Sequence, residues 1–473
     1  MTGASGYIGG RLVPRLLARG HSLRLLTRQP KALTARFPQC EIVAGDVSDG
    51  VVLGRALDGI DAAYYLIHSM RTNRRDFADR DRATAQAFAR AAQAAGVGRI
   101  IYLGGLGDER ADLSEHLRSR QEVGQILAST GVPVTEFRAA VIVGSGSVSF
   151  EMIRYLTERL PAMVAPRWVK TRCQPIAIRD VLSYLTNTLD LPNTAGRIYE
   201  IGGADVLSYR EMMFTYARIR GLRRFMLVVP VLTPRLSSYW VHLVTPIPAY
   251  IARNLIDSLH NEVVVHDESA RRDFAIEPMG YADAVQRALN RYTPAGPETT
   301  WFDAPDIAAL PGEFAGLTQG MLIDRRERRS GATPMALFAV FSGLGGTRGW
   351  LYADWLWELR GAIDGLMGGI GRRRGRRSQT ELRVGDALDF WRVEAYEPNH
   401  LLRLRAEMKV PGHAWLQFEA LPARDGTGSA LRQTAFFEPR GIFGYLYWYA
   451  VAPLHTLIFG KMATRIAQLA ERT

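Results

Sequence analysis

Three glycines stand at three-residue spacing at the start of the sequence, Gly3, Gly6 and Gly9 in the stretch TGASGYIG. Gly3 permits a tight bend, Gly6 lets the backbone approach an anion, and Gly9 lets a following helix lie close to a sheet. The N–H groups in the first turn of that helix attract phosphate. The stretch therefore predicts a site for the pyrophosphate of a dinucleotide, lined by Gly3, Ser5, Gly6, Tyr7, Ile8 and Gly9. A flexible glycine-rich segment is the alternative, because the chain has 45 glycines.

Polar residues after two later strands indicate which dinucleotide binds. The apolar run SLRLLT ends at Thr27 and Arg28, where an NAD-selective site places a carboxylate for the ribose 2′-hydroxyl. Arg28 instead offers a guanidinium to a 2′-phosphate, so NADP(H) is predicted over NAD(H); the alternative is a solvated loop arginine. Asp46, after EIVAG, is predicted to meet the adenine amino group, to cap a helix, or to do both. The predicted cofactor site is completed by Val47, Leu66 and Gly104.

The elements that would position these residues alternate along the first part of the chain. Helical stretches and short apolar runs follow one another from Tyr7 to about Arg138. Strict alternation predicts a parallel sheet with helices on both faces, and strands that are apolar throughout fit that burial. The predicted strands are SLRLLT, EIVAG, DAAYYLI, RIIYLGG and VPVTEFR, and the predicted helices cover about 7–19, 51–57, 74–95 and 114–130.

The remainder of the chain divides into three parts. From Ala139 to Tyr292 the alternation loosens into a substrate lobe, with a further strand in RIYEIGG and a helix in SYREMMFTYARIRG. Prolines and glycines mark a linker at 293–318. Residues 319–473 then predict an antiparallel sheet covered by a terminal helix. Its predicted strands are DFWRVEAYEP, LLRLRAEMKV, AWLQFEAL and ALRQTAFFEP, and its helices cover about 334–342, 350–366 and 445–471.

A family resemblance rests on TGASGYIG, the arginine after SLRLLT, GDV after the next strand, and RIIYLGGL. These residues resemble the atypical short-chain dehydrogenase/reductase superfamily, in its NmrA-like, NAD(P)H-binding branch, over about residues 2–292. The resemblance implies an α/β fold with a doubly wound Rossmann sheet of strand order 3-2-1-4-5-6. The first strand of that order is central, yet only Met1 precedes the glycine turn. We therefore expect the natural product to begin upstream, with roughly 5–6 more apolar residues of strand.

The catalytic residues of typical members are missing from their expected places. Those members use a Tyr, a Lys one helical turn later and a Ser to protonate the carbonyl oxygen. The strand RIIYLGG ends at Gly104 and Gly105, where the Ser would stand, and the next helix has His116 and Arg120 at the Tyr and Lys spacing. The candidate catalytic residues are His116, or His68 and Ser69 in LIHSM. The alternatives are a surface role for His116 and a domain that binds NADP(H) without turnover, as NmrA-like redox sensors are thought to do.

A second resemblance covers about residues 319–473. The segments DFWRVE, AEMKVPGHAWLQFE and QTAFFEPRGIFGYLYWY, with the closing helix, resemble the START-like, helix-grip (polyketide-cyclase-type) superfamily. That family curls its sheet around the long helix and leaves a cavity for an apolar ligand. Six aromatic residues are expected either to line such a cavity or to form plain core: Trp391, Trp415, Phe418, Phe436, Tyr447 and Trp448.

The formal net charge of +12 permits an anionic partner. Of 59 basic residues, however, only Lys31, Lys170, Lys409 and Lys461 are lysine, a bias typical of genome base composition. Nucleic acid is therefore disfavoured as a partner. Arg372–Arg377 is the one basic run, and it predicts a site for anionic lipid headgroups or a phosphate, with a solvated loop as the alternative.

Other sequence features bear on where the protein works. Two cysteines, Cys40 and Cys173, exclude a disulfide framework and indicate a reducing compartment. The start of the sequence lacks a secretory signal. The apolar stretch 225–256 is interrupted by four prolines, so we expect it to pack within the lobe. A cytoplasmic protein is predicted, and peripheral association with a membrane stays open.

The expected activity is hydride transfer between NADPH and a hydrophobic carbonyl or enone held by the lobe or by the second cavity. The alternative is a non-catalytic redox sensor, or a lipid-binding or apolar-ligand-binding protein that takes NADP(H) as a ligand.

Overall fold

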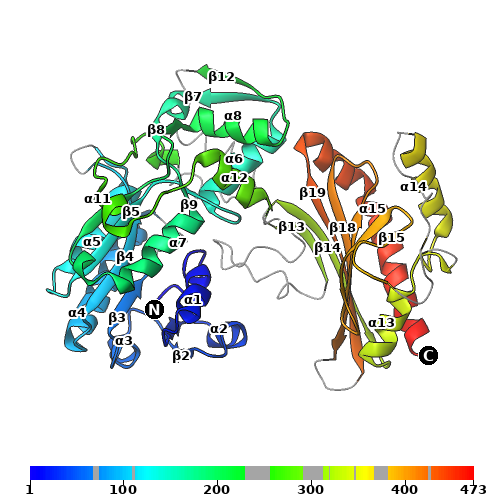
Figure 1. Cartoon of the computed structure of the whole chain (residues 1–473), viewed down its shortest axis with the longest axis horizontal. Coiled ribbons are helices and arrows are strands. Elements are labelled where there is room, and N and C mark those ends of the chain that lie inside the picture. The colour runs from blue at the N-terminus through cyan, green and yellow to red at the C-terminus, as the bar shows by residue number, and fades with distance from the viewer. Residues whose placement is uncertain are drawn as a thin grey trace. The chain divides into compact units, whose positions relative to one another are not determined.

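The computed structural model describes all residues except 68–73, 109–111, 230–255, 291–312, 319, 346–347, 367–375, 377–381, 424–427 and 473. The chain divides into two compact units, Met1–Asp306 and Ile307–Thr473 (Figure 1). The division falls inside the segment 293–318 that the sequence marks as a linker.

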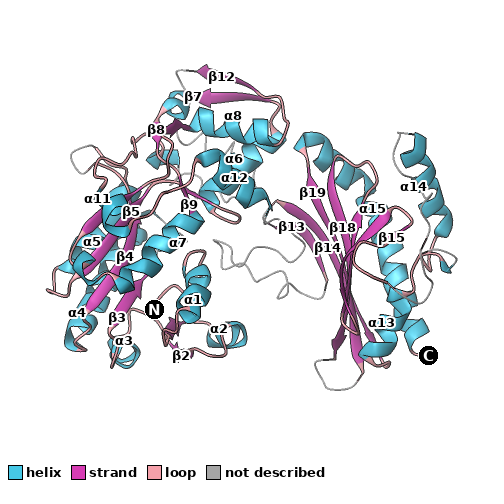
Figure 2. Cartoon of the chain, in the orientation of Figure 1, coloured by secondary structure: helices cyan, strands magenta, loops and turns pink. Residues whose placement is uncertain are grey.

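The N-terminal unit alternates strands and helices as predicted, with one further helix, α2, between the first two strands (Figure 2). Each predicted strand forms within one to three residues of its expected limits, because strands buried on both faces leave continuous apolar runs in a sequence. The elements are α1 (Gly9–Ala18), β1 (Arg24–Thr27), α2 (Pro30–Arg36), β2 (Glu41–Ala44), α3 (Gly50–Leu57), β3 (Ala62–Tyr65), α4 (Arg74–Ala94), β4 (Arg99–Gly105), α5 (Glu115–Ala128) and β5 (Val134–Ala139).

The strands form two parallel groups, β1–β2 and β10-β5-β4-β3, where β10 is Ile198–Ile201. Met1 and Thr2 lie between the groups. The N–H of Leu26 donates to the Met1 carbonyl at 3.0 Å, and the N–H of Thr2 donates to the Tyr64 carbonyl at 3.0 Å. The resulting order agrees with the expected Rossmann order, with Met1 and Thr2 at the position of its first strand.

Helices cover both faces of this sheet. Alternate residues of β3 and β4 point to opposite sides, so Tyr65 and Ile100 pack with α3 and α4, while Tyr64 and Ile101 pack with α1 and α7 (Ile178–Asn187). Both groups are almost fully buried. The carboxyl ends of the parallel strands therefore meet at one edge of a rigid layer.

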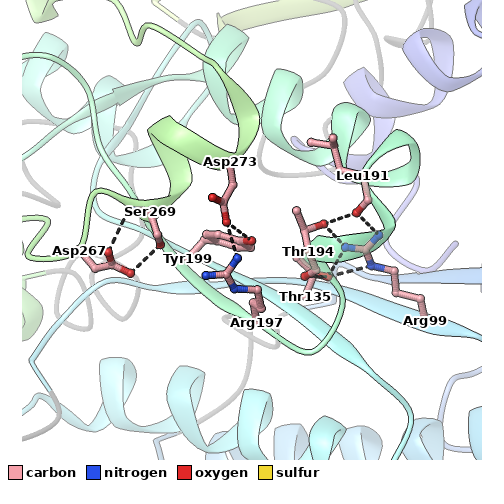
Figure 3. Close-up of polar contacts among 9 residues, drawn as sticks. All are labelled: Arg99, Thr135, Leu191, Thr194, Arg197, Tyr199, Asp267, Ser269 and Asp273. Carbon is pink, nitrogen blue, oxygen red and sulfur yellow. Dashed lines mark hydrogen bonds and ion pairs between the residues drawn. The ribbon is translucent and has the colours of Figure 1, made fainter.

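A buried arginine joins the sheet to the segment that leads to β10 (Figure 3). Arg99, at the start of β4, donates through Nε to Thr135 Oγ1 at 2.8 Å and through Nη1 to the Thr188 carbonyl at 2.7 Å. Its Nη2 also donates to Thr194 Oγ1. The neighbouring contact in the same view, between Arg197 and Asp273, is an exposed ion pair.

The lobe consists of short strand pairs and helices, as the looser pattern after Ala139 predicts. Its pairs are β6 with β9, β7 with β12, and β8 with β11. The bounds are β6 (Ile142–Val143), α6 (Val148–Arg159), β7 (Ala162–Pro166), β8 (Arg172–Cys173), β9 (Ile176–Ala177), β11 (Leu207–Ser208), α8 (Tyr209–Ile219), β12 (Phe225–Val229), α11 (Ser269–Phe274) and α12 (Tyr281–Asn290). Most of the apolar stretch 225–256 lies outside the described residues.

The C-terminal unit is a seven-stranded antiparallel sheet of order β13-β14-β19-β18-β17-β16-β15 with helices on one face (Figure 1). The long helix α15 (Gly441–Ala470) packs on β14 and β19. The other elements are β13 (Phe314–Thr318), β14 (Met321–Ser330), α13 (Pro334–Ser342), α14 (Asp354–Leu366), β15 (Ala387–Leu388), β16 (Trp391–Glu397), β17 (Leu401–Ala406), β18 (Gly412–Pro422) and β19 (Ser429–Pro439).

The six aromatic residues expected as core or cavity lining fall into separate places. Trp391, Phe418 and Trp448 belong to the apolar core between the sheet and its helices. Trp415 and Phe436 are also buried and pair across β18 and β19. Tyr447 accepts a hydrogen bond from Arg360 at 3.2 Å. Core packing accounts for the first three of these residues.

Candidate functional site

A pocket of about 700 Å³ opens at the carboxyl ends of the parallel strands. Every residue predicted to bind the cofactor lines it, although these residues come from several separate elements. They are Gly3, Ser5, Gly6, Tyr7, Ile8, Gly9, Arg28, Asp46, Val47, Leu66 and Gly104. The parallel sheet brings them together because each stands at or shortly after the end of a strand, or in the turn that leads into α1.

The glycine turn is closed so tightly that it requires glycine at two positions. Gly3 has φ +70°, and a Cβ on it would lie 2.4 Å from the Leu66 carbonyl oxygen. A Cβ on Gly9 would lie 2.2 Å from the Gly3 carbonyl oxygen. Helix α1 begins at Gly9, and the residues that lead into it, from Ser5 to Gly9, line the same pocket. This cradle fits the pyrophosphate of a dinucleotide.

A buried arginine, Arg11, binds the backbone of the glycine turn. Arg11 donates through Nη1 to the Tyr7 carbonyl at 3.2 Å and through Nη2 to the Ser145 carbonyl at 3.0 Å. Its guanidinium carbon also lies 4.2 Å from the centre of the Tyr7 ring. The glycine turn is thereby joined to the loop between β6 and α6. Ser147 of that loop and Ser149 of α6 also line the pocket.

The predicted adenosine end of the pocket carries two arginines and one carboxylate. Arg28 and Arg80 both line it, and Arg28 Nη1 lies 3.8 Å from Asp46 Oδ2. Hydrogen bonds from the Ser48 backbone and hydroxyl, with Arg28 and Arg80 nearby, lower the pKa of Asp46. Asp46 therefore stays ionised. Asp49, not Asp46, caps α3, accepting from the N–H groups of Val51 and Val52, so the helix-cap alternative for Asp46 was wrong.

The candidate catalytic residue His116 lies in the pocket wall. It belongs to α5, which begins after Ser114, whose hydroxyl accepts from the Leu117 N–H at 3.3 Å. His116 is half-buried rather than an exposed surface residue. The other two candidates, His68 and Ser69, lie outside the described residues.

Arg120, at the position of the usual Lys, serves the packing of α5 on β4. Its Nη2 donates to the Leu103 carbonyl, and its guanidinium carbon lies 5.0 Å from the centre of the Tyr102 ring. Gly104 is equally constrained, because a Cβ there would lie 3.1 Å from Glu136 Oε1. The positions of the usual Ser and Lys therefore carry residues that pack α5 on β4, whereas His116, at the position of the usual Tyr, lines the pocket.

The lobe supplies the far wall of the pocket, which the sequence analysis missed. Tyr209, Ser258, Leu259 and Val263 line this wall. The hydroxyls of Ser114 and Ser258 lie 3.0 Å apart, so this wall is joined to the start of α5. No local pattern marks these residues, since they lie more than a hundred residues from the glycine turn. Arg80 was also missed, although its place in the helix after β3 was a usable signal.

The basic run Arg372–Arg377 is described only at Arg376. Arg376 donates through Nη1 to the carbonyls of Ser342 and Leu344 at 2.9 and 2.7 Å. This guanidinium therefore binds the backbone at the end of α13, within the C-terminal unit.

Cys40 and Cys173 are buried free thiols. Among the residues that the structure describes, no group of three or more His, Cys, Asp and Glu side chains is arranged to hold a metal ion.

Comparisons with known proteins agree with this site. Residues 3–140 match the family described as NAD(P)H-binding, and residues 318–462 match a family described as a protein of unknown function (DUF2867). The (4-alkanoyl-5-oxo-2,5-dihydrofuran-3-yl)methyl phosphate reductase of Streptomyces griseus is 30% identical over 229 residues, which cover 47% of this chain and 73% of the relative.

Two solved structures share the fold of the N-terminal unit. An NADPH-dependent quinone oxidoreductase of Escherichia coli, complexed with NADPH, has a TM-score of 0.51 at 18% identity, covering 61% of this chain and 99% of that one. The triphenylmethane reductase of Citrobacter sp., complexed with NADP(H), has a TM-score of 0.51 at 16% identity, with coverage of 61% and 99%. The S. griseus relative and the match of residues 3–140 show that the chain belongs, through its N-terminal unit, to the NAD(P)H-binding, NmrA-like family of short-chain dehydrogenase/reductase-type proteins.

Proposed function

We propose that this protein is an NADPH-dependent reductase that acts on an apolar molecule with a conjugated carbonyl group. The observation that carries the proposal is a single pocket in which the glycine cradle, two arginines and His116 line the wall together. Arg28 and Arg80 favour NADPH over NADH, because a guanidinium pairs well with the additional 2′-phosphate. When bound, NADPH supplies a hydride.

The substrate class follows from the walls of the pocket beyond the cradle. They are mainly apolar: Leu106, Leu117, Val141, Val148, Leu259 and Val263. Such walls exclude water and hold a hydrocarbon chain or ring. The S. griseus relative is named for an alkanoyl-dihydrofuranone that carries a methyl phosphate group, and its ring double bond is conjugated to carbonyl groups. We infer a similar chemistry for this chain, namely an electron-poor double bond or carbonyl on an apolar body.

His116 is the proposed proton donor. Hydride addition to an enone moves the double-bond electron pair onto the carbonyl oxygen, and a proton must then reach the resulting enolate. His116 of α5 lines the pocket, as do Gly105 at the end of β4 and Leu106 directly after it. A general acid placed in this way typically contributes 10²–10⁴-fold to the rate.

For the C-terminal unit we propose a START-like helix-grip domain. The antiparallel sheet with a long terminal helix across it supports this assignment.

The function is tested by following NADPH absorbance with purified full-length protein. The acceptors are alkyl-substituted enones and 2,5-dihydrofuranones of increasing chain length, with their saturated analogues as controls. We expect oxidation of NADPH that depends on the enone and improves with chain length. Tight binding of NADPH with no oxidation by any acceptor would contradict a reductase and favour a redox sensor.

A further inference from the structure

The outer face of α15 exposes large apolar side chains in the C-terminal unit. Five of them are between 46% and 73% exposed. They are Phe443, Leu446, Tyr449, Leu454 and Leu457. The most apolar 18-residue window of the helix has a mean hydropathy of 1.3, and only 28% of that window is buried. A helix that merely served as the core of a soluble domain would bury most of such a window.

The exposed residues form one stripe along the helix, which we call the outer stripe of α15. Phe443, Leu446, Leu454 and Leu457 follow one another at intervals that keep them on one side of the helix, and Tyr449 borders them. The same side continues into Lys461 and Arg465, both of them exposed. Exposed Arg440 immediately precedes the helix. The stripe is thus apolar along its middle and cationic at both ends.

The charge on α15 has one sign. Between Gly441 and Ala470 the helix has no Asp or Glu, and its fixed charges are Lys461 and Arg465. The whole chain has a formal net charge of +12. A second copy of the chain meets this face with like charge, whereas an anionic surface meets it with opposite charge.

The opposite side of α15 prevents it from crossing a bilayer. Trp448, Phe459, Met462 and Ile466 on that side are buried in the core of the unit. A helix held along its length by a sheet can only lie parallel to a surface. Interfacial helices have this arrangement, with apolar and aromatic residues at the level of the headgroups and Lys or Arg at the edge.

The neighbouring helix α14 adds further exposed apolar residues. Trp357 of α14 lies near Phe459 of α15, with ring centres 6.3 Å apart, and Arg360 donates to Tyr447. Trp355 and Leu359 on α14 are at least half exposed. Tryptophan is enriched at membrane–water interfaces, because its ring is apolar and its N–H is polar.

From these observations we propose that the outer stripe of α15 binds the C-terminal unit to an anionic lipid surface, with the helix lying along the headgroups. This proposal does not depend on the proposed reductase activity.

The test is co-flotation of the full-length protein with vesicles. One vesicle set is phosphatidylcholine alone and the other contains about one-quarter phosphatidylglycerol. We expect flotation with the anionic set, weakened by high salt. The double variant Phe443→Glu/Leu446→Glu should reduce vesicle partitioning at least tenfold. Lys461→Glu should reduce it about fivefold on anionic vesicles, because each cation near the surface contributes to binding.

Matched controls separate lipid binding from misfolding and from self-association. Val164→Glu/Leu227→Glu replaces two apolar residues of similar exposure in the N-terminal unit and should leave flotation unchanged. NADPH affinity should remain at the wild-type value in every variant, whether or not turnover occurs. The proposal is overturned if the wild-type protein stays unbound with both vesicle sets. It is also overturned if the Phe443→Glu/Leu446→Glu variant turns a dimer into a monomer and leaves flotation unchanged.

Discussion

Arg28 and Asp46 form an ion pair at the pocket mouth, with 3.8 Å between Arg28 Nη1 and Asp46 Oδ2. Both side chains are largely exposed, so the pair itself adds little to stability. Its effect is to hold the Arg28 guanidinium at the pocket, where Arg80 also interacts with Asp46. A 2′-phosphate at this place would meet two cations, whereas a 2′-hydroxyl carries no charge to pair with them.

Replacing Arg28 or Arg80 by Ala should weaken NADPH binding selectively. We expect the dissociation constant for NADPH to rise about tenfold for each variant, because a charge-assisted contact is lost. The constant for NADH should change little. Isothermal calorimetry with both coenzymes measures the difference. Arg90 is an exposed arginine of α4, the helix that contains Arg80, but it does not line the pocket. The control variant Arg90→Ala should therefore bind both coenzymes as the wild type does. Equal losses for NADPH and NADH would contradict the assignment.

Gly9→Ala should abolish coenzyme binding. The new Cβ would stand 2.2 Å from the Gly3 carbonyl oxygen, so the turn must open and its amides lose their common direction. Calorimetry together with far-ultraviolet circular dichroism separates loss of binding from loss of fold. Gly54→Ala is the control, since a Cβ there meets nothing within 4 Å. In that exposed helical position we expect stabilisation by about 0.5–1 kcal/mol with binding unchanged. An intact affinity in Gly9→Ala would refute the cradle.

His116→Gln should lower kcat about a hundredfold while leaving NADPH affinity unchanged, because the proposed proton donor is removed and the cradle is not. Steady-state kinetics on an active enone measures the effect. Arg118→Gln changes an exposed neighbour on the same helix and should keep full activity. If His116→Gln retains wild-type kcat, the proton comes from elsewhere.

Arg99→Met should destabilise the N-terminal unit far more than Arg197→Ala (Figure 3). Arg99 is buried, and its loss leaves the hydroxyls of Thr135 and Thr194 with fewer partners away from water. We expect a cost of about 3 kcal/mol in the free energy of unfolding. The exposed pair between Arg197 and Asp273 should be worth less than about 1 kcal/mol. Urea unfolding of both variants provides the comparison, and similar costs would contradict this account.

The C-terminal unit should lose stability as pH falls from 6.5 to 4. Burial, with Arg326 and Arg360 nearby, lowers the pKa of His455 from 6.5 to about 4. Between these values the unfolded chain takes up a proton and the folded chain does not, so the free energy of unfolding falls as pH falls. We expect a loss of about 2 kcal/mol across this window and none of it above pH 6.5. Thermal unfolding of wild type and His455→Leu measures it. The variant should show a flatter pH dependence.

The sequence allowed prediction of the elements that obey a simple burial rule. Strands β3, β4 and β5 are covered on both faces, and their apolar runs were recognisable. The cradle was predictable because two of its glycines, Gly3 and Gly9, stand where a side chain would collide with the backbone. Strand β14 was missed, since its sequence MLIDRRERRS is mostly charged. Asp324 and Arg326 nevertheless lie in a strand that is paired on both sides, by β13 and β19, and they pair with each other at 3.2 Å.

The pocket could be predicted only in part for a similar reason. Its cofactor side is made by residues next to strand ends, and those ends are recognisable because each strand is a continuous apolar run. Its far wall, from Tyr209 and Val263, depends on how the lobe folds back over the sheet. No property of those residues in the sequence distinguishes them from ordinary core.

Ser145 sets a lower limit on how short a working fragment can be. Its carbonyl accepts from Arg11 beneath the cradle, and its hydroxyl donates to the Ala288 carbonyl at the end of α12. A truncation at residue 140, where the family match stops, removes both bonds and leaves Arg11 with fewer acceptors in the interior. Ser145 therefore connects the first helix of the chain to α12, which ends at Asn290, and we expect an excised coenzyme-binding module to be more stable when it extends that far.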